Sequence, residues 1–293
     1  MTQTSFKGIT EMQITHAPIG SLYPLRDGGL MSTSANLGYR QKIATVWNPS
    51  TGLEKLTLNG HNKYLTQVCQ LKNGLVATAS HGNTIILWDV EQQQSDKQQQ
   101  VLVLKDEYNE FVSYVCPLSN GHLASGFSCN VIIWNSNTGK QTSTLRVNGG
   151  ISSLLQLNDG LLAVGSDDET IWLKNLETGQ SVMALKEPID DRIHCMCHLQ
   201  DDTLISGSGR TINMWDVRSG KCSMTLEGPA LIWSLCPLYD GRFLSASDDD
   251  TVIVWNVQTG KNEMTFERGH TVCQLINETV AIGNFNGEID LLK

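Results

Sequence analysis

A motif that recurs at nearly constant spacing constrains the fold of this 293-residue chain more than any other feature. Five apolar runs end in Trp followed by Asp or Asn: ATVWN (44–48), IILWD (85–89), VIIWN (131–135), INMWD (212–216) and VIVWN (252–256). Two further runs align with these five, with Lys174 and Leu292 in the Trp position. The seven positions are 47, 88, 134, 174, 215, 255 and 292, and a repeat of about 40 residues is typical of propellers, solenoids and arrays.

Each repeat has the same internal order of strands and turns. An apolar strand ends at a turn such as QLKNG, PLSNG, QLNDG or PLYDG, and Asn-Gly or Asp-Gly pairs favour hairpins. A small-residue strand, the Trp strand, a Thr-Gly or Ser-Gly turn and a fourth strand follow. Four short antiparallel strands in each of seven units predict an all-β, seven-bladed propeller that occupies residues 1–293 as a single domain. The polar run EQQQSDKQQQ (91–100) lengthens one repeat and is interpreted as a loop insertion.

The first strand of the chain is expected to complete the last blade. A glycine follows the Trp position by five residues in five repeats, but in the last repeat it would fall at 297, beyond the sequence. The segment Lys7–Ile14 matches Thr51–Leu58, with Ile14 in the place of Leu58. This strand would therefore close the ring and remove an open sheet edge.

These seven repeats resemble the WD-repeat (Trp-Asp repeat) β-propeller family over about residues 5–293. Well-formed members share a hydrogen-bonded tetrad of His, Ser or Thr, Asp and Trp. The Asp occurs here as Asp168 and Asp249, and one repeat combines His61, Ser80 and Trp88 but has Gly82 in the Asp position. The resemblance implies a non-enzymatic interaction scaffold that binds a peptide or protein partner.

Charge and composition narrow the partners and the location. The chain has 21 Lys and Arg against 30 Asp and Glu, a net charge of −9, and no basic run, which argues against nucleic acid and against an anionic membrane surface. No run is long and apolar enough to span a bilayer, and no secretory signal is apparent. We expect a cytoplasmic protein that is a monomer on its own, and the eight Cys show no disulfide spacing.

The run His194-Cys195-Met196-Cys197-His198 suggests a metal site. Alternation along a strand places its two Cys on one face and its two His on the other, which suits tetrahedral coordination poorly. Cys197 also aligns with Cys at 69, 116, 236 and 273, so we interpret it as packing between blades. We predict no metal and no cofactor. No phosphate loop, GxSxG or HExxH occurs, and a propeller enzyme with scattered catalytic residues stays as an alternative.

Candidate binding residues come from the loops that share one face of a propeller. The loops from the fourth strand of one blade to the first strand of the next, and the hairpins before the Trp strand, form what we call the top face. The residues flanking the first apolar residue of each inner strand, and residues of the adjoining hairpins, should line the channel there. They are Tyr64, Thr66, His81, Phe111, Phe127, Asp167, Arg192, His194, Leu231, Trp233, Asp248, Arg268, His270 and Phe285, together with Pro18, Gly20, Ser113, Gly150, Ser152 and Ser208.

Trp233 is the most informative of these residues, because it is the one Trp of seven outside a Trp strand. Aromatic and Arg side chains at such a rim have the composition of binding hot spots. Asp167 and Asp248 nearby would favour a basic group on the partner.

A second function remains open through the segment Trp215-Asp216-Val217-Arg218. It resembles the WDxR box by which some WD-repeat proteins dock to the adaptor of cullin-type ubiquitin ligases. Arg218 would then make the adaptor contact, and the protein would be a substrate receptor. The alternative interpretation of Arg218 is a solvated turn side chain.

Overall fold

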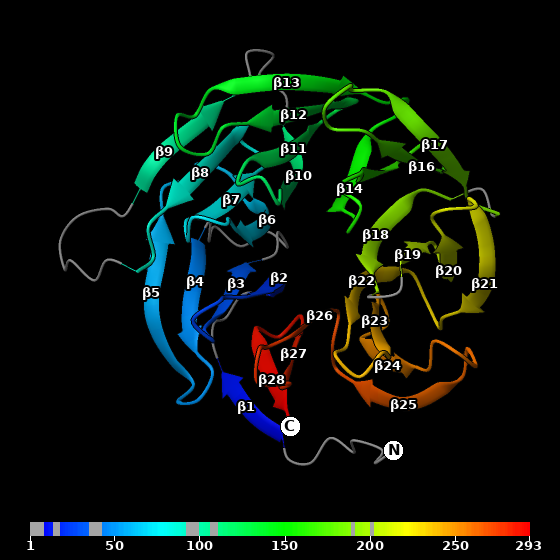
Figure 1. Cartoon of the computed structure of the whole chain (residues 1–293). Helices are drawn as coiled ribbons and strands as arrows, with labels where there is room; N and C mark the ends of the chain where they lie inside the picture. Colours follow the sequence, from blue (N-terminus) through cyan, green and yellow to red (C-terminus); the bar gives the residue numbers. More distant parts are fainter. Residues whose placement is uncertain are drawn as a thin grey trace.

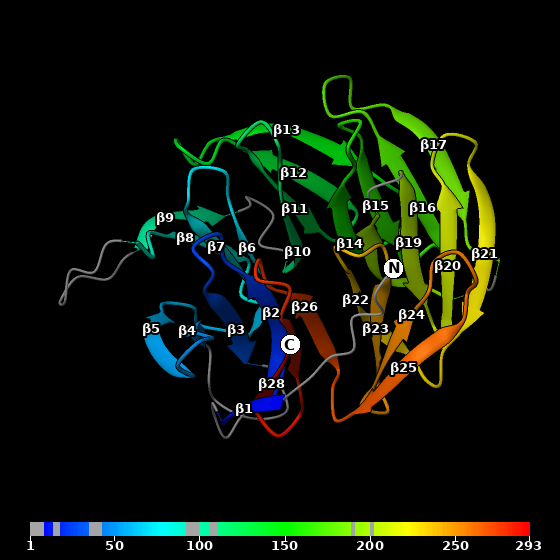
Figure 2. The same ribbon diagram turned by 60° about the horizontal axis from the view of Figure 1, so that its bottom comes forward.

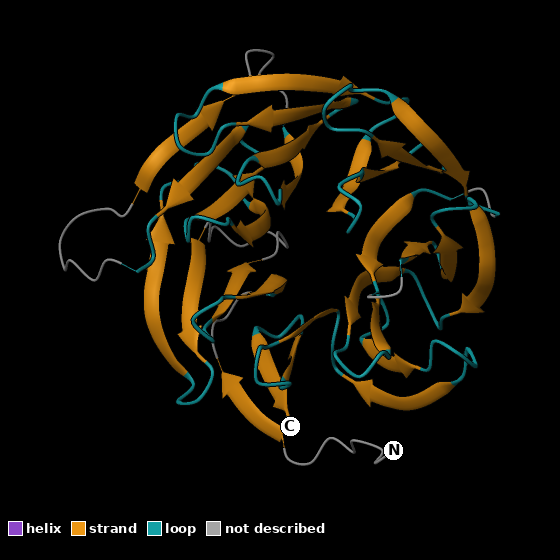
Figure 3. Cartoon of the chain, viewed as in Figure 1, coloured by secondary structure: helices purple, strands orange, loops and turns teal. Residues whose placement is uncertain are grey.

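The computed structural model describes residues 9–13, 18–34, 43–91, 100–105, 111–188, 191–199 and 202–293. These residues form strands and loops, with no helix among them (Figure 3). The strands make seven four-stranded antiparallel sheets arranged as blades around a central channel (Figure 1). The predicted all-β fold with seven blades is therefore confirmed.

In blades 1 to 6 the order of the strands from the channel outward follows the order in the chain. Blades 1 and 2 contain β2 (Ile19–Pro24), β3 (Leu30–Ser34), β4 (Ile43–Asn48) and β5 (Leu53–Asn59), then β6 (Leu65–Gln70), β7 (Val76–Ser80), β8 (Thr84–Trp88) and β9 (Gln100–Lys105). Blades 3 and 4 contain β10 (Val112–Pro117), β11 (Leu123–Phe127), β12 (Asn130–Trp134) and β13 (Gln141–Arg146), then β14 (Ile151–Gln156), β15 (Leu162–Ser166), β16 (Thr170–Lys174) and β17 (Ser181–Lys186).

The remaining three blades follow the same plan. Blades 5 and 6 contain β18 (Ile193–His198), β19 (Thr203–Ser208), β20 (Thr211–Asp216) and β21 (Lys221–Glu227), then β22 (Ile232–Pro237), β23 (Phe243–Ser247), β24 (Thr251–Trp255) and β25 (Asn262–Glu267). Blade 7 contains β26 (Thr271–Gln274), β27 (Val280–Gly283) and β28 (Glu288–Leu292), and its fourth strand is β1 (Ile9–Gln13). Of the insertion 91–100, only its two end residues lie in the described part of the chain.

Strand β1 lies antiparallel beside β28 in both ribbon views (Figures 1 and 2). Its register differs by two residues from the one predicted. Met12 pairs with Ile289, and this is the position that Leu58 occupies opposite Ala44 in blade 1. Ile14, which the sequence placed there, lies outside the described residues. A shift of two residues leaves every position of a strand on the same face of the sheet, so the hydrophobic pattern does not distinguish the two registers.

The seven Trp positions occupy equivalent places in their blades. Leu123 pairs with Trp134, and in the same way Leu162 pairs with Lys174 and Val280 with Leu292. In the five blades that have Trp at this repeat position, the indole Nε1–H donates to a hydroxyl on the neighbouring strand at 2.6–2.9 Å. The pairs are Trp47–Ser32, Trp88–Thr78, Trp134–Ser125, Trp215–Ser206 and Trp255–Ser245. These bonds satisfy buried donors and join the second and third strands of each blade.

The hydroxyl that meets His61 differs from the one predicted. His61 Nε2 contacts Thr78 Oγ1 at 2.7 Å, the same oxygen that accepts from Trp88, and His61 Nδ1 contacts Thr84 Oγ1 at 3.1 Å. Ser80, the residue predicted for this role, contacts Thr84 Oγ1 at 3.2 Å instead. Both Thr78 and Ser80 are buried on β7 and lie two residues apart, so periodicity alone does not choose between them.

Blade 4 has no Trp at its repeat position. Lys174 is buried there, and its Nζ donates to the carbonyl oxygen of Arg146 at 2.8 Å. Burial lowers the pKa of its amino group. Trp172, two residues earlier, packs partly buried against the cluster between blades 3 and 4 and donates to Asp168 Oδ2 at 3.3 Å.

The recurring cysteines pack between blades, as predicted. Cys69, Cys116, Cys197, Cys236 and Cys273 are buried and belong to hydrophobic clusters that join neighbouring sheets. Cys195 and Cys197 are free thiols, and burial raises the pKa of each. In the described ranges, no three His, Cys, Asp or Glu side chains are grouped so as to hold a metal ion. Those ranges also contain no helix with the length and apolarity to cross a bilayer.

Candidate functional site

A repeated irregularity in the innermost strands positions side chains in the channel. In blades 1 to 6 the pairing of the first strand with the second skips one residue just after the strand begins. The skipped residues are Gly20, Thr66, Ser113, Ser152, His194 and Trp233. Such bulges bend a strand and redirect one side chain, a feature common beside functional sites. His270, which precedes β26, takes the same place in blade 7 through its backbone bond to Gly283.

These seven residues all line one cavity of about 580 Å³ at the top end of the channel. We call them the rim residues: Gly20, Thr66, Ser113, Ser152, His194, Trp233 and His270. The sequence predicted each of them as lining the channel, and in the structure each lines this cavity. Asp248 and Phe285, from the adjoining hairpins, line the same cavity. The partner-binding role of these residues stays a prediction.

Trp233 is held in a defined orientation although its surface is 41% exposed. Its Nε1–H donates to Asp248 Oδ1 at 2.9 Å, and its ring meets His194 edge-on with the ring centroids 5.2 Å apart. An exposed aromatic side chain that is fixed before binding loses little conformational entropy when a partner packs against it. This is the arrangement expected of a binding anchor rather than of a core residue.

His270 and Phe285 also line the larger cavity, but here, unlike at Trp233, the polar ring is buried. Their rings stack with centroids 4.1 Å apart, and His270 is 8% exposed. Burial lowers the pKa of His270 to about 4, so its ring is neutral near pH 7. Its Nδ1 and the Oγ of Ser152, another rim residue, are buried and have no hydrogen-bond partner among the described residues. A ligand that forms a hydrogen bond with such a buried polar atom stabilises its complex with the protein.

A smaller cavity of about 280 Å³ adjoins the first and shares His194 and Trp233 with it. Phe111, Asp167 and Arg192 line this space, so it combines an aromatic ring with one charge of each sign. Burial lowers the pKa of His194, and the nearby Arg192 lowers it further. A neutral His194 can therefore accept or donate one hydrogen bond between the two cavities.

Three aromatic rings stack in a column beside the smaller cavity. His81 lies between Tyr64 and Phe111, with centroid distances of 4.6 Å and 4.4 Å. Phe111 is 46% exposed at the end of this column. The column joins a loop of blade 2, a hairpin of blade 2 and the start of blade 3, and the sequence predicted all three residues at the top face.

Phe127 is wrongly predicted as a rim residue. It is fully buried on β11, packs against Trp134 and belongs to the core cluster of blades 2 and 3. The reason is hairpin length, because the hairpin between β11 and β12 has two residues, whereas the one between β7 and β8 has three. A fixed count of seven residues back from each Trp position reaches the loop in blade 2 but reaches the strand in blade 3.

The same offset buries Ser208 on β19 of blade 5, where the hairpin is also short. Ser128, one residue after Phe127, is the side chain that lines the smaller cavity. Sequence reasoning missed Ser128, and its signal was the seven-residue interval in place of eight between the end of β11 and Trp134. Leu231 is half-buried and Arg268 is exposed, and neither lines either of the two cavities.

Arg218 lies on the opposite face, in the turn after β20. Its guanidinium Nη2 pairs with Asp202 Oδ2 at 2.6 Å, and Asp216 Oδ1 accepts from the backbone N–H of Arg218 at 2.9 Å. The hydroxyl of Ser219 also donates to Asp216, and these hydrogen bonds hold the pKa of that carboxyl below its usual range. The side chain is thus a solvated turn residue with an ion-pair partner, and its docking role stays a prediction.

The fold and the recurring Trp–hydroxyl pairs define a seven-bladed β-propeller, and comparison with known sequences identifies its repeats. Three segments, 52–89, 179–216 and 220–256, match the model of the family described as WD domain, G-beta repeat. Each match begins at a glycine that follows a repeat position and ends one residue after the next Trp. The chain is therefore a seven-bladed β-propeller with WD repeats in these three segments, and propellers built from WD repeats typically act as protein-interaction scaffolds.

Three curated relatives share part of the chain. Human WD repeat-containing protein 41 is 25% identical over 192 residues, which cover 59% of this chain and 40% of the relative. Mitochondrial division protein 1 from Pyricularia oryzae and from Aspergillus terreus is 26% identical over 135 and 136 residues. These two alignments cover 33% and 36% of this chain and 20% of each relative. The matches therefore span less than half the length of each relative.

Proposed function

We propose that this propeller is a non-catalytic scaffold that binds an extended segment of a partner protein at the top mouth of its channel. The observation that carries the proposal is the rim itself. All seven blades contribute one residue to the same cavity, and these residues are distributed asymmetrically around the ring. Gly20 of blade 1 has no side chain, blades 2 to 4 contribute hydroxyl groups, and blades 5 to 7 contribute imidazole or indole rings. A rim whose chemistry changes around a rigid ring of sheets is suited to recognising an asymmetric ligand.

The chemistry of the rim favours a partner with both an apolar and a basic group. Trp233 and Phe111 offer exposed aromatic surface, and Asp167 and Asp248 offer carboxylates beside them. An apolar side chain against Trp233 with a Lys or Arg near Asp248 would use both features. The net charge of −9 would also draw a basic partner toward the propeller.

Affinity capture with a triple variant tests this proposal. The variant Tyr64→Ala/Phe111→Ala/Trp233→Ala removes the aromatic surface of the rim, and Leu53→Ala/Val101→Ala/Val182→Ala removes exposed apolar side chains elsewhere. Circular dichroism and thermal melting should first show that both variants fold. We expect proteins captured by the wild type to be retained by the second variant and lost by the first. Partners that bind all three proteins equally would contradict a top-face site.

We also infer that the protein works in the cytoplasm. All eight cysteines are free thiols, which agrees with a reducing compartment. Fractionation of cells that express the full chain would test the location, and recovery in a secreted fraction would contradict it.

A further inference from the structure

The bottom end of the channel has its own ring of equivalent positions. In every blade the turn between the first two strands starts at a buried Leu whose N–H bonds the carbonyl four residues on. The next residue stands at the bottom rim. Around the ring these residues are Arg26, Lys72, Ser119, Asn158, Gln200, Tyr239 and Ile276, of which Gln200 lies outside the described part of the chain.

Two neighbouring blades place cations at this rim. Arg26 and Lys72 line a cavity of about 580 Å³ that opens at the bottom of the channel. Arg26 Nη1 donates to the carbonyl of Lys72 at 2.9 Å, and Lys72 Nζ donates to the carbonyl of Ser119 at 3.2 Å. Each cation thus leans toward the next blade.

Neither cation forms an ion pair within the described ranges. Asp27, which adjoins Arg26, pairs with Lys55 at 3.3 Å. The carboxylate of Glu91 lies beside Gly74, two residues after Lys72. In a chain with a net charge of −9, these two adjacent cations at a cavity mouth present a positive site to an anionic group.

The two blades before the cations place apolar side chains at the same rim. Tyr239 is 56% exposed and Ile276 is 54% exposed. Blade 7 lies between blade 6 and blade 1 in the ring, so the rim reads Tyr239, Ile276, Arg26, Lys72 over four consecutive blades (Figure 1). An apolar pair followed by a basic pair fits a ligand that carries both apolar and acidic groups.

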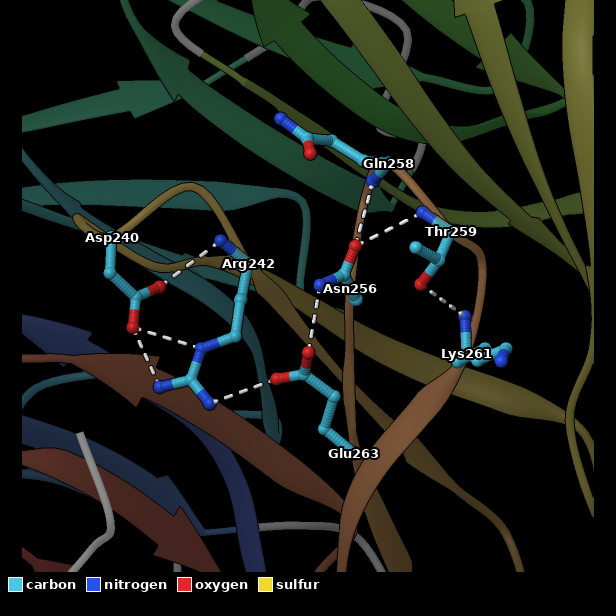
Figure 4. Close-up of polar contacts among 7 residues, drawn as sticks. All are labelled: Asp240, Arg242, Asn256, Gln258, Thr259, Lys261 and Glu263. Carbon is cyan, nitrogen blue, oxygen red and sulfur yellow. Dashed lines mark hydrogen bonds and ion pairs between the residues drawn. The ribbon is translucent and has the colours of Figure 1, made fainter. Parts of the chain in front are cut away.

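The turn that carries Tyr239 is fixed before any ligand binds. Arg242 bonds Asp240 Oδ2 at 2.6 Å and Glu263 Oε2 at 3.3 Å, and Asn256 donates to Glu263 Oε1 at 2.7 Å (Figure 4). The same Asn256 accepts from the backbone N–H groups of Gln258 and Thr259, and Thr259 Oγ1 accepts from the N–H of Lys261, so the two bottom turns of blade 6 form one network.

The backbones of two rim residues are also tied to the following blades. The N–H of Tyr239 donates to Gln274 Oε1 at 2.8 Å, and the N–H of Arg26 donates to Gln70 Oε1 at 2.9 Å. Preorganised anchors lose less entropy on binding.

We propose that this bottom rim binds an extended acidic segment of a partner protein. Its carboxylates pair with Arg26 and Lys72, and an apolar side chain packs against Tyr239 and Ile276. The apolar pair is what distinguishes this segment from a small anion. The site is separate from the top rim, so it stands whether or not the top face binds a partner.

Fluorescence anisotropy with a defined peptide tests the proposal. The probe is a labelled peptide of Glu-Glu-Phe triplets of about twelve residues, about 40 Å when extended, and its control has Gln in place of Glu. We expect Arg26→Glu/Lys72→Glu to weaken binding of the acidic peptide at least about tenfold, because attraction becomes repulsion. Tyr239→Ser/Ile276→Ser should weaken it by about fivefold through lost apolar contact.

Matched variants separate this site from general charge effects. Lys105→Glu/Lys186→Glu makes the same change in net charge at exposed ends of β9 and β17 and should change affinity by less than about twofold. The top-face triple variant should bind the acidic peptide as the wild type does. Loss of binding in either of these variants would overturn the proposal.

Three other results would also overturn it. They are no binding of the acidic peptide by the wild type at about 1 mM, equal binding of the Gln peptide, and full displacement by pyrophosphate with no effect of the Tyr239/Ile276 variant. The last result would indicate a small-anion site in place of a peptide site.

Discussion

The hydroxyl of Thr78 joins two other side chains of blade 2, so replacing Thr78 should destabilise this blade. It accepts from Trp88 Nε1 at 2.7 Å and contacts His61 Nε2 at 2.7 Å, and the residue is fully buried. If the hydroxyl donates to His61 Nε2, His61 Nδ1–H is left to donate to Thr84 Oγ1, and every polar atom of the group is paired. This arrangement needs a neutral imidazole, in agreement with burial that lowers the pKa of His61 to about 4.

We predict that Thr78→Val destabilises the protein by about 2–5 kcal/mol. Valine keeps the shape of threonine and suits a strand, so the loss is that of the hydroxyl. The substitution leaves the buried Trp88 N–H and His61 Nε2 without partners, and each unpaired buried group costs about 1–3 kcal/mol. Urea unfolding at pH 7, followed by circular dichroism, measures the change in the free energy of unfolding.

Two further variants make the reasoning refutable. Thr78→Ser keeps the hydroxyl and loses one methyl, so it should cost about 1 kcal/mol. Ser125→Ala in blade 3 removes a hydroxyl that accepts from Trp134 and has no contact with a histidine of the described residues. It should therefore lower the free energy of unfolding by about 1–3 kcal/mol. If Thr78→Val proves no more destabilising than Thr78→Ser, the hydroxyl does not hold this group together.

Three other outcomes follow from the structure. Phe127→Ala should cost about 3–5 kcal/mol by urea unfolding, because a buried ring is lost from the core, whereas a rim residue would cost little. The pKa of His61 is near 6.5 in the unfolded chain and about 4 in the folded one. Its contribution to the free energy of unfolding is therefore present above pH 6.5 and is lost as the pH falls through 4. Between pH 7 and pH 5, the free energy of unfolding should fall by about 2 kcal/mol more for the wild type than for His61→Asn. Gly139→Ala should cost about 2–4 kcal/mol in the same assay, since φ is 69° and a Cβ there would overlap Leu102, whereas Gly121→Ala, with φ 85° and open space, should cost about 1 kcal/mol.

The fold could be read from the sequence because each blade repeats the same packing problem. A Trp or its substitute recurs at one position, and Lys174 and Leu292 keep that position in register even though their chemistry differs. The register in which β1 pairs with β28 is harder to predict from the sequence. That strand lies at an outer edge, where a shift of two residues keeps the same faces, so Met12 and Ile14 are equivalent in pattern.

The rim was predictable where it depends on strand position and not where it depends on loop length. Every residue that follows the first apolar residue of an inner strand lines the top cavity, because the bulge recurs in six blades and His270 takes that place in the seventh. Hairpin residues obey no such rule. One residue fewer in a hairpin moves Phe127 from the rim into the core and brings Ser128 to the cavity. A repeat pattern does not encode that difference, because it is set by local turn geometry.

The Trp positions and their hydroxyls occur together, and this explains why the rim is free to vary. The five blades with Trp have Ser or Thr at the accepting position, whereas blades 4 and 7, with Lys174 and Leu292, have Val164 and Ile282 there. A buried indole N–H without an acceptor is costly, so a blade keeps both members or neither. These pairs lie on the second and third strands, and the rim residues lie on the first. The fold is therefore fixed away from the channel, and the seven rim residues can differ in chemistry without loss of the blades that present them.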